Sequence, residues 1–128
     1  MPDRLNTALM GSSMGGLITT YAAVQYNNVF SKYGCLSNAY WFALDELIED
    51  IKNSKMCDLM LYMDVGTSEG GELVRSDDYL ISNENVYKEL SKKDIDLNYM
   101  VFEDAIHNED EWSIKFPYVI KWLFRREQ

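Results

Sequence analysis

Short apolar runs alternate along this chain with longer segments in which apolar residues recur every three or four positions. The apolar runs predict four strands, over residues 6–10, 33–36, 59–65 and 98–102. The segments with the longer period predict four helices, over residues 15–26, 41–52, 77–90 and 111–124. Regular alternation of strands and helices predicts an α/β fold, a three-layer sandwich with a mainly parallel sheet, right-handed crossovers and helices on both faces.

The last predicted helix has the clearest amphipathic pattern. Its apolar residues at helical spacing are Trp112, Phe116, Val119, Ile120 and Leu123. Pro117 either kinks this helix or marks its start. The chain has 128 residues, 47% of them hydrophobic, which suits a single domain over residues 1–128 with its own core.

The first predicted strand leads directly into Gly11-Ser12-Ser13-Met14-Gly15, which fits the pattern Gly-x-Ser-x-Gly. In a tight strand-to-helix turn, this pattern projects the central serine as a nucleophile. The glycines on either side of Ser13 remove side chains that would clash, and the free N–H of Met14 can donate to an oxyanion. The alternative is a glycine- and serine-rich loop, or a helix N-cap in which Ser12 or Ser13 accepts a backbone hydrogen bond.

The single histidine of the chain, His107, follows the last predicted strand after a short acidic loop. A neutral imidazole there could take the proton of the serine hydroxyl as a general base, although a lone loop histidine is more often a solvated surface residue. A carboxylate that orients the imidazole should follow an intervening strand. Glu69, in the glycine-flanked loop after residues 59–65, fits that place.

Three other carboxylates remain alternatives for this third position: Asp64, Glu72 and Asp104. Glu69 could also be an ordinary exposed glutamate in an acidic chain. The order Ser13, Glu69, His107, with each residue after a predicted strand, is the Ser…Asp/Glu…His order of α/β-hydrolases. Three independent placements therefore agree on a serine hydrolase.

At these residues the chain resembles the putative esterase family of α/β-hydrolases, which includes enterochelin esterase-like, feruloyl esterase-like and esterase D-like enzymes. The segments that carry the resemblance are the elbow at residues 11–16, the acid loop at residues 64–69 and the histidine loop at residues 107–112. The resemblance implies Ser13 as nucleophile, Glu69 as acid and His107 as base. Many relatives have aspartate where this chain has Glu69.

Residues 36–41 also resemble a loop that borders the substrate pocket in such enzymes, which implies substrate-binding roles for Tyr40 and Trp41. The alternative is core packing, which is at least as common for two aromatics that open a helix. The reaction implied by the resemblance is hydrolysis of a small-molecule carboxylic ester through an acyl-serine intermediate, without a cofactor.

Family members are commonly about twice this long, so the chain looks like the C-terminal half of the α/β-hydrolase fold, and the second oxyanion N–H would belong to the other half. Met14 would then supply one of two donors, and loss of one donor typically costs ~10²–10³ in turnover. Two alternatives to an active esterase follow: a catalytically impaired remnant or interaction module, and an acyltransferase that uses the same residues.

Composition argues against several other function classes. The chain has one histidine and lacks C-x-x-C and H-E-x-x-H patterns, so we expect no metal site. The net charge of −9 disfavours nucleic-acid binding. No apolar run approaches the length of a membrane span, and the first residues are no signal peptide, so we expect no membrane partner and a cytoplasmic location. Cys35 and Cys57 lie within or beside predicted strands, and we interpret both as small buried hydrophobes.

The first predicted strand is expected to have a free edge. In the α/β-hydrolase fold the strand before the nucleophile is central, whereas here residues 7–10 would have one row of unpaired backbone groups. Exposed strand edges recruit partners. We therefore expect a homodimer in which two copies associate through this strand.

Overall fold

In the computed structural model, which describes residues 3–125, strands and helices alternate as predicted. The strands are β1 (Ala8–Ser12), β2 (Lys32–Leu36), β3 (Cys57–Ser68) and β4 (Asp94–Ile106). The α-helices are α1 (Met14–Gln25), α2 (Leu44–Asn53), α3 (Ser76–Leu90) and α4 (Glu109–Leu123). Short 3-10 turns occupy Arg4–Asn6 and Tyr40–Ala43.

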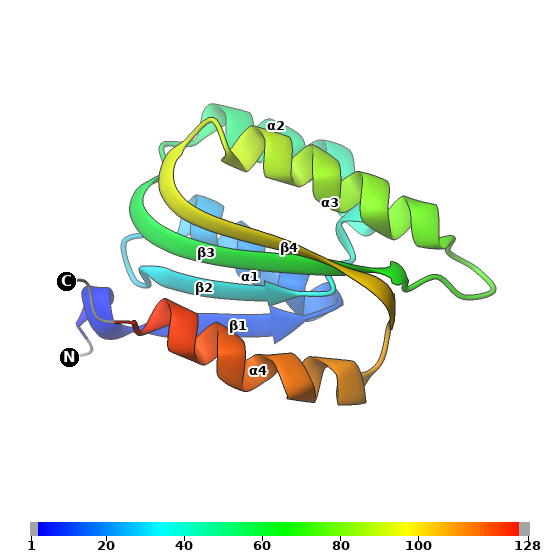
Figure 1. Cartoon of the computed structure of the whole chain (residues 1–128). Helices are drawn as coiled ribbons and strands as arrows, with labels where there is room; N and C mark the ends of the chain where they lie inside the picture. Colours follow the sequence, from blue (N-terminus) through cyan, green and yellow to red (C-terminus); the bar gives the residue numbers. More distant parts are fainter. Residues whose placement is uncertain (1–2, 126–128) are drawn as a thin grey trace.

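The four strands form one parallel sheet in the order β1-β2-β3-β4. Because each crossover advances the sheet by one strand in the same direction, α1, α2 and α3 pack on the same face. Helix α4 follows the last strand and packs on the opposite face (Figure 1). The prediction of a three-layer α/β fold is confirmed.

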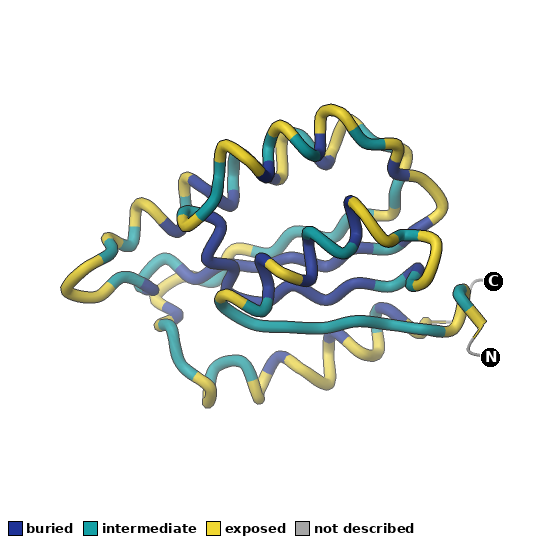
Figure 2. The backbone as a smooth tube through the Cα atoms, turned by 180° about the vertical axis from the view of Figure 1, so that it is seen from behind, coloured by how far each residue is buried: buried dark blue, intermediate teal, exposed yellow. Residues whose placement is uncertain are grey.

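The core is divided by the sheet into two parts of unequal size. Strand residues that point toward α1, α2 and α3 include Tyr33, Cys35, Leu61 and Met63. The smaller part, under α4, is formed by Leu36, Tyr62, Val119 and Leu123. Successive residues of a strand point to opposite faces, which is why Cys35 and Leu36 belong to different parts of the core. Figure 2 shows buried residues concentrated on the central strands and exposed residues on the outer sides of the helices.

Some boundaries differ from the sequence-based expectations. Strands β3 and β4 extend beyond the apolar runs that predicted them, because they pair with each other over most of their length. Helix α4 begins at Glu109 and continues through Pro117, so this proline does not mark its start. Cys35 is buried, as predicted. Cys57 is exposed at the first residue of β3, so the prediction that it is buried is wrong.

The parallel arrangement brings the carboxyl ends of all four strands to one edge of the sheet. The strands end there at Ser12, Leu36, Ser68 and Ile106. The loops that carry the candidate catalytic residues follow these ends, where α/β proteins assemble their sites. Within the described residues, β1 pairs with β2 alone. None of the helices in residues 3–125 is long and apolar enough to cross a membrane.

Candidate active site

Ser13 lies in the turn between β1 and α1 in a backbone conformation that residues with a side chain rarely adopt, with φ 58° and ψ −120°. Although Ser13 precedes the helix, its side chain makes no capping hydrogen bond. Its Oγ lies 2.8 Å from Nε2 of His107 instead. Ser13 therefore occupies the N-cap position, but its hydroxyl does not cap the helix as the alternative expected. The turn is strained, as the Gly-x-Ser-x-Gly pattern predicts.

Two glycines allow the close packing around this turn. A Cβ on Gly11 would collide with the carbonyl group of Gly15. A Cβ on Gly15 would meet nothing within 4 Å, so the expectation that a side chain there would clash is wrong. The second demanding position is Gly16, where a Cβ would collide with the Asn38 side chain and lie 3.2 Å from the carbonyl oxygen of Leu36.

His107 follows β4, and its two ring nitrogens have different partners. Nδ1 lies 2.8 Å from Oε1 of Glu69, and Nε2 lies 2.8 Å from Oγ of Ser13. The other carboxylate oxygen of Glu69 accepts a hydrogen bond from the N–H of Gly66 at 2.7 Å. Because an ionised carboxylate only accepts, Nδ1 carries the hydrogen and Nε2 is left to accept the hydroxyl proton of Ser13.

Glu69 is the one candidate carboxylate that contacts His107 within the described residues. The side chain of Glu69 is fully buried, while that of His107 is 20% exposed, so the imidazole is the more accessible partner. Glu72 and Asp104 are both exposed. The interpretation of Glu69 as an ordinary surface glutamate is therefore wrong.

Asp64, the remaining candidate, is fully buried on β3 and has other partners. Its Oδ1 accepts a hydrogen bond from the N–H of Ser37 and its Oδ2 from the hydroxyl of Tyr62, both at 2.7 Å. Burial raises the pKa of Asp64, and the positive charge of Lys115 on α4 opposes that shift. Lys115 is itself buried, with Nζ 4.2 Å from the centre of the Phe102 ring. Asp64 therefore supports the loop after β2 rather than the imidazole.

Two aromatic rings that the sequence analysis did not assign to the site flank the imidazole of His107. The ring centre of Tyr79 lies 5.0 Å from that of His107, and the ring centre of Trp112 lies 4.9 Å from it, nearly perpendicular at 81°. The position of Trp112, five residues after His107, was a usable local signal. Tyr79 comes from α3, and no local pattern in the sequence identified it as part of the site.

Met14, predicted to supply an oxyanion donor, is the first residue of α1. Met14 directly follows Ser13, and its N–H has no acceptor inside the helix because it belongs to the first turn. Its side chain is exposed. An N–H in this position can donate to negative charge that develops on an oxygen bound near Ser13.

The two aromatics predicted to line a substrate pocket have different environments. Tyr40 is fully buried, with its hydroxyl 2.6 Å from that of Thr20, so a pocket role for Tyr40 is wrong. Burial also raises the pKa of Tyr40. Trp41 lines a cavity of about 440 Å³ beside α3, and its ring packs 5.9 Å from that of Tyr79. A role for Trp41 in substrate binding stays a prediction.

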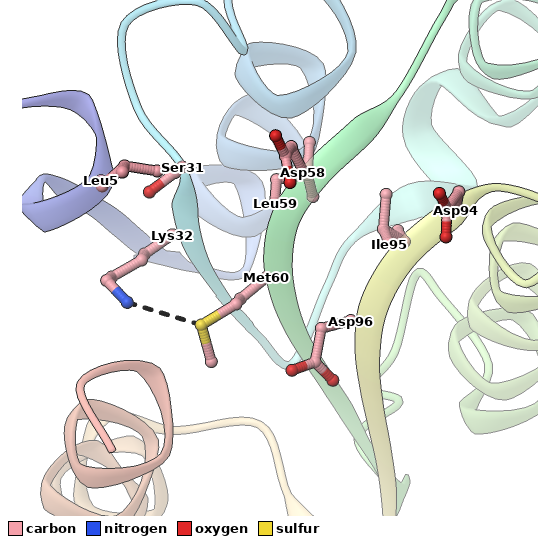
Figure 3. Close-up of a pocket in the computed structure, with 9 residues that line it drawn as sticks. All are labelled: Leu5, Ser31, Lys32, Asp58, Leu59, Met60, Asp94, Ile95 and Asp96. Carbon is pink, nitrogen blue, oxygen red and sulfur yellow. Dashed lines mark hydrogen bonds between the residues drawn. The ribbon is translucent and has the colours of Figure 1, made fainter. Parts of the chain in front are cut away.

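Two further cavities lie at opposite ends of the sheet. One of about 480 Å³ adjoins His107 and is lined also by Asn108, Glu109, Asp110 and Trp112. The other, of about 570 Å³, lies at the amino ends of β2, β3 and β4 (Figure 3). Its lining residues are Leu5, Ser31, Lys32, Asp58, Leu59, Met60, Asp94, Ile95 and Asp96. None of the candidate catalytic residues is among them, so this second cavity is separate from the site.

Residues 2–123 match the profile of the family described as Putative esterase. The chain belongs to the Putative esterase family. This esterase-family chain is 24% identical over 124 residues to "Uncharacterized protein YbbA" of Bacillus subtilis (strain 168), a match that covers 94% of the chain and 50% of that protein. The chain therefore spans about half the length of this curated relative.

Solved structures similar to this esterase-family chain are also longer than it. A ferulic acid esterase matches with a TM-score of 0.77 and 14% identity, over 96% of this chain and 52% of that one. An enterochelin esterase from Shigella flexneri matches with a TM-score of 0.78 and 18% identity, over 98% of this chain and 32% of that one. These matches confirm the α/β fold expected from the sequence, and the family profile confirms the expected family.

Proposed function

We propose that this esterase-family chain is a serine carboxylic-ester hydrolase that acts on a small-molecule ester through an acyl-serine intermediate. The observation that carries the proposal is the continuous hydrogen-bonded chain from Glu69 through His107 to Ser13, with 2.8 Å at both links. The strained backbone of Ser13 between β1 and α1 supports the same role. Similarity to proteins named ferulic acid esterase and enterochelin esterase supports an ester as the substrate.

In the first half-reaction, Oγ of Ser13 attacks the ester carbonyl carbon while Nε2 of His107 takes the hydroxyl proton. Glu69 holds the imidazole in the required tautomer and stabilises the imidazolium that forms. The N–H of Met14 donates to the oxyanion. When the bond to the alcohol oxygen breaks, His107 returns the proton to the leaving alkoxide, and the acyl group remains on Ser13.

In the second half-reaction, water attacks the acyl carbon and Nε2 of His107 takes one of its protons. The tetrahedral intermediate then collapses by breaking its bond to Oγ of Ser13. His107 gives the proton to this oxygen, and the carboxylic acid leaves. These steps use side chains of the chain and water, and no cofactor.

A catalytically impaired form is the second candidate, and the oxyanion donor found among residues 3–125 bears on it. The N–H of Met14 is one donor, whereas the hydrolase oxyanion hole uses two, and removal of one costs ~10²–10³ in turnover. A form with one donor would still activate Ser13 through His107 but would turn over substrate slowly.

A fluorophosphonate probe tests the step that both candidates share, because it modifies a serine whose hydroxyl is activated. We expect labelling of the wild-type chain, none of Ser13→Ala, and near-normal labelling of the control Ser12→Ala, since Ser12 ends β1 and the hydrogen bond to His107 comes from Ser13. His107→Gln should slow labelling by roughly 10³–10⁴. Intact-mass spectrometry measures the modification.

Hydrolysis of a chromogenic acetate ester completes the test. Labelling with turnover supports the esterase, and labelling with little turnover supports the impaired form. If the wild-type chain were not labelled at Ser13, the proposal that Ser13 is an activated nucleophile would be wrong.

A further inference from the structure

The backbone of Ser13 is held on both sides by the loop after β2. The N–H of Ser13 donates to the carbonyl of Leu36 at 2.9 Å, and the N–H of Ala39 donates to the carbonyl of Ser13 at 3.2 Å. A residue at positive φ persists only where its surroundings over-determine its conformation. Residues 36–39, which we call the clamp loop, therefore help to hold the elbow.

The clamp loop is itself strained and buried. Ser37 has a φ of 48°, and its N–H donates to Oδ1 of Asp64 at 2.7 Å. Asn38 is fully buried, and its Nδ2 donates to the carbonyl of Cys35 at 3.0 Å. The Asn38 side chain also lies against the backbone of Gly16 in the first turn of α1. A strained loop can hold Ser13 only if it is fixed in turn.

Asn83 of α3 fixes the clamp loop from outside the elbow. Its Nδ2 donates to the carbonyl of Asn38 at 2.9 Å, and its Oδ1 accepts from Nδ2 of Asn38 at 3.2 Å. The same Nδ2 lies 2.9 Å from the carbonyl of Tyr79, whose ring packs on His107. Asn83 is fully buried. One amide thus contacts both the loop that holds the nucleophile and the residue packed on the base.

We propose that Asn83 is a positioning residue, which keeps the clamp loop in place and thereby holds the Ser13 backbone in its elbow conformation. The consequence for catalysis rests on the proposed function, whereas the effect on the backbone does not. The competing explanation is that Asn83 only satisfies buried polar groups, in which case its loss would weaken the whole fold and not the elbow in particular.

Two substitutions of Asn83 disrupt its hydrogen bonds to the clamp loop in different ways, and a third substitution serves as control. Asn83→Ala removes every hydrogen bond of the side chain. Asn83→Asp changes one atom and keeps the volume, but it replaces the donor that faces the carbonyls of Asn38 and Tyr79 by an oxygen. Asn85→Ala is the matched control, because Asn85 lies two residues further along α3, is only half-buried and makes no hydrogen bond to the clamp loop.

Amide hydrogen exchange measured by NMR tests the backbone effect. In both Asn83 variants we expect the amides of Ser13 and Ala39 to exchange about tenfold faster or more, relative to the amide of Leu61 in the core of β3. Asn85→Ala should leave these ratios unchanged. Exchange that rises equally at Ser13, Ala39 and Leu61 would mean global destabilisation and would overturn the proposal, as would no change at all.

The rate of fluorophosphonate labelling at Ser13 tests the catalytic consequence. We expect it to fall about 10- to 100-fold in the Asn83 variants, because a displacement of ~1 Å at a reacting group can cost ~10² in rate. With a chromogenic ester, kcat should fall while KM stays near the wild-type value. If Asn83→Ala does not fold, the volume-conserving Asn83→Asp decides the result.

The outcomes separate this inference from the proposed function. If the wild-type chain is not labelled, the proposed function fails, and the exchange ratios alone decide whether Asn83 holds the elbow. If the wild-type chain is labelled and both Asn83 variants exchange and react as it does, the positioning role of Asn83 is wrong and the proposed function stands.

Discussion

Two individual residues with unfavourable backbone conformations lie side by side at the carboxyl edge of the sheet. Ser13 and Ser37 have φ values of 58° and 48°, and the N–H of Ser13 donates to the residue before Ser37. Each such conformation costs of order 1–3 kcal/mol in a residue other than glycine. The hydrogen bonds donated to Leu36 and Asp64 and the one donated by Ala39 offset part of this cost. The strain is therefore placed at the nucleophile that the proposed reaction needs.

The two cysteines should differ sharply in reactivity. Cys35 is fully buried in the sheet, and burial raises the pKa of its thiol to about 12. The thiolate is the nucleophile, so burial both suppresses the ionisation of Cys35 at about pH 8 and blocks access to it. Cys57 is exposed. We expect iodoacetamide to modify Cys57 and not Cys35 in the folded protein, as measured by peptide mass mapping.

Unfolding provides the control for this cysteine prediction. In concentrated denaturant both thiols should react, and the folded Cys57→Ser variant should remain unmodified. Modification of Cys35 in the folded chain at a rate near that of Cys57 would contradict its burial, and would mean that β2 opens readily.

At the scale of elements, the hydrophobic pattern was informative where one face of a segment is buried. The order of four strands and four helices follows from it, because burial on one face imposes a period of two on strands and 3.6 on helices. The hydrophobic pattern failed at strand ends that backbone pairing holds in place. Asp94 and Asp96 in β4 are examples, because their side chains are polar. The pattern also missed the 3-10 turn Tyr40–Ala43, which replaces the start of a predicted helix.

The start of α1 offers a matched pair of substitutions at neighbouring glycines. A Cβ on Gly16 would collide with Asn38, so Gly16→Ala should destabilise the chain by about 1–3 kcal/mol. A Cβ on Gly15 meets open space, and alanine favours the helix over glycine, so Gly15→Ala should stabilise it by about 0.5–1 kcal/mol. Urea unfolding with a common m-value measures both free energies.

The informative result is which of the two substitutions, Gly15→Ala or Gly16→Ala, lowers the free energy of unfolding. The Gly-x-Ser-x-Gly pattern predicts a steric role for Gly15. In the structure Gly16 has this role, because a Cβ there would collide with Asn38. If Gly15→Ala proved the more destabilising of the two, the packing of Asn38 against the first turn of α1 would be wrong.

At the scale of the whole molecule, the candidate site depends on contacts between distant parts of the chain. Proximity of Ser13, Glu69 and His107 could be anticipated, because parallel strands send their following loops to one edge. The pair formed by Asn38 and Asn83 could not, since 45 positions separate them and both are ordinary polar residues in the sequence. Local patterns identify which elements meet, but not which buried amides join them.

Within residues 3–125, one edge of β1 has no strand beside it, and this edge bears on association. The carbonyl of Thr7 accepts a hydrogen bond from Ser31 beside β2, so the polar backbone groups of the next residue, Ala8, point away from β2. Those of Met10 point the same way, because the direction alternates along a strand. In the described residues these groups have no strand partner. A second copy related by two-fold symmetry could pair there through its own β1.

We propose that the chain forms a homodimer through β1 and expect sedimentation analysis to show it at tens of micromolar, within the usual range for such interfaces. Ala8→Pro should weaken the dimer, because proline removes an outward N–H, while the first residue of an edge strand tolerates it. Helical content by circular dichroism should stay the same, which separates lost pairing from unfolding. A wild-type chain that remains monomeric at these concentrations would show that the edge of β1 is not a self-association surface.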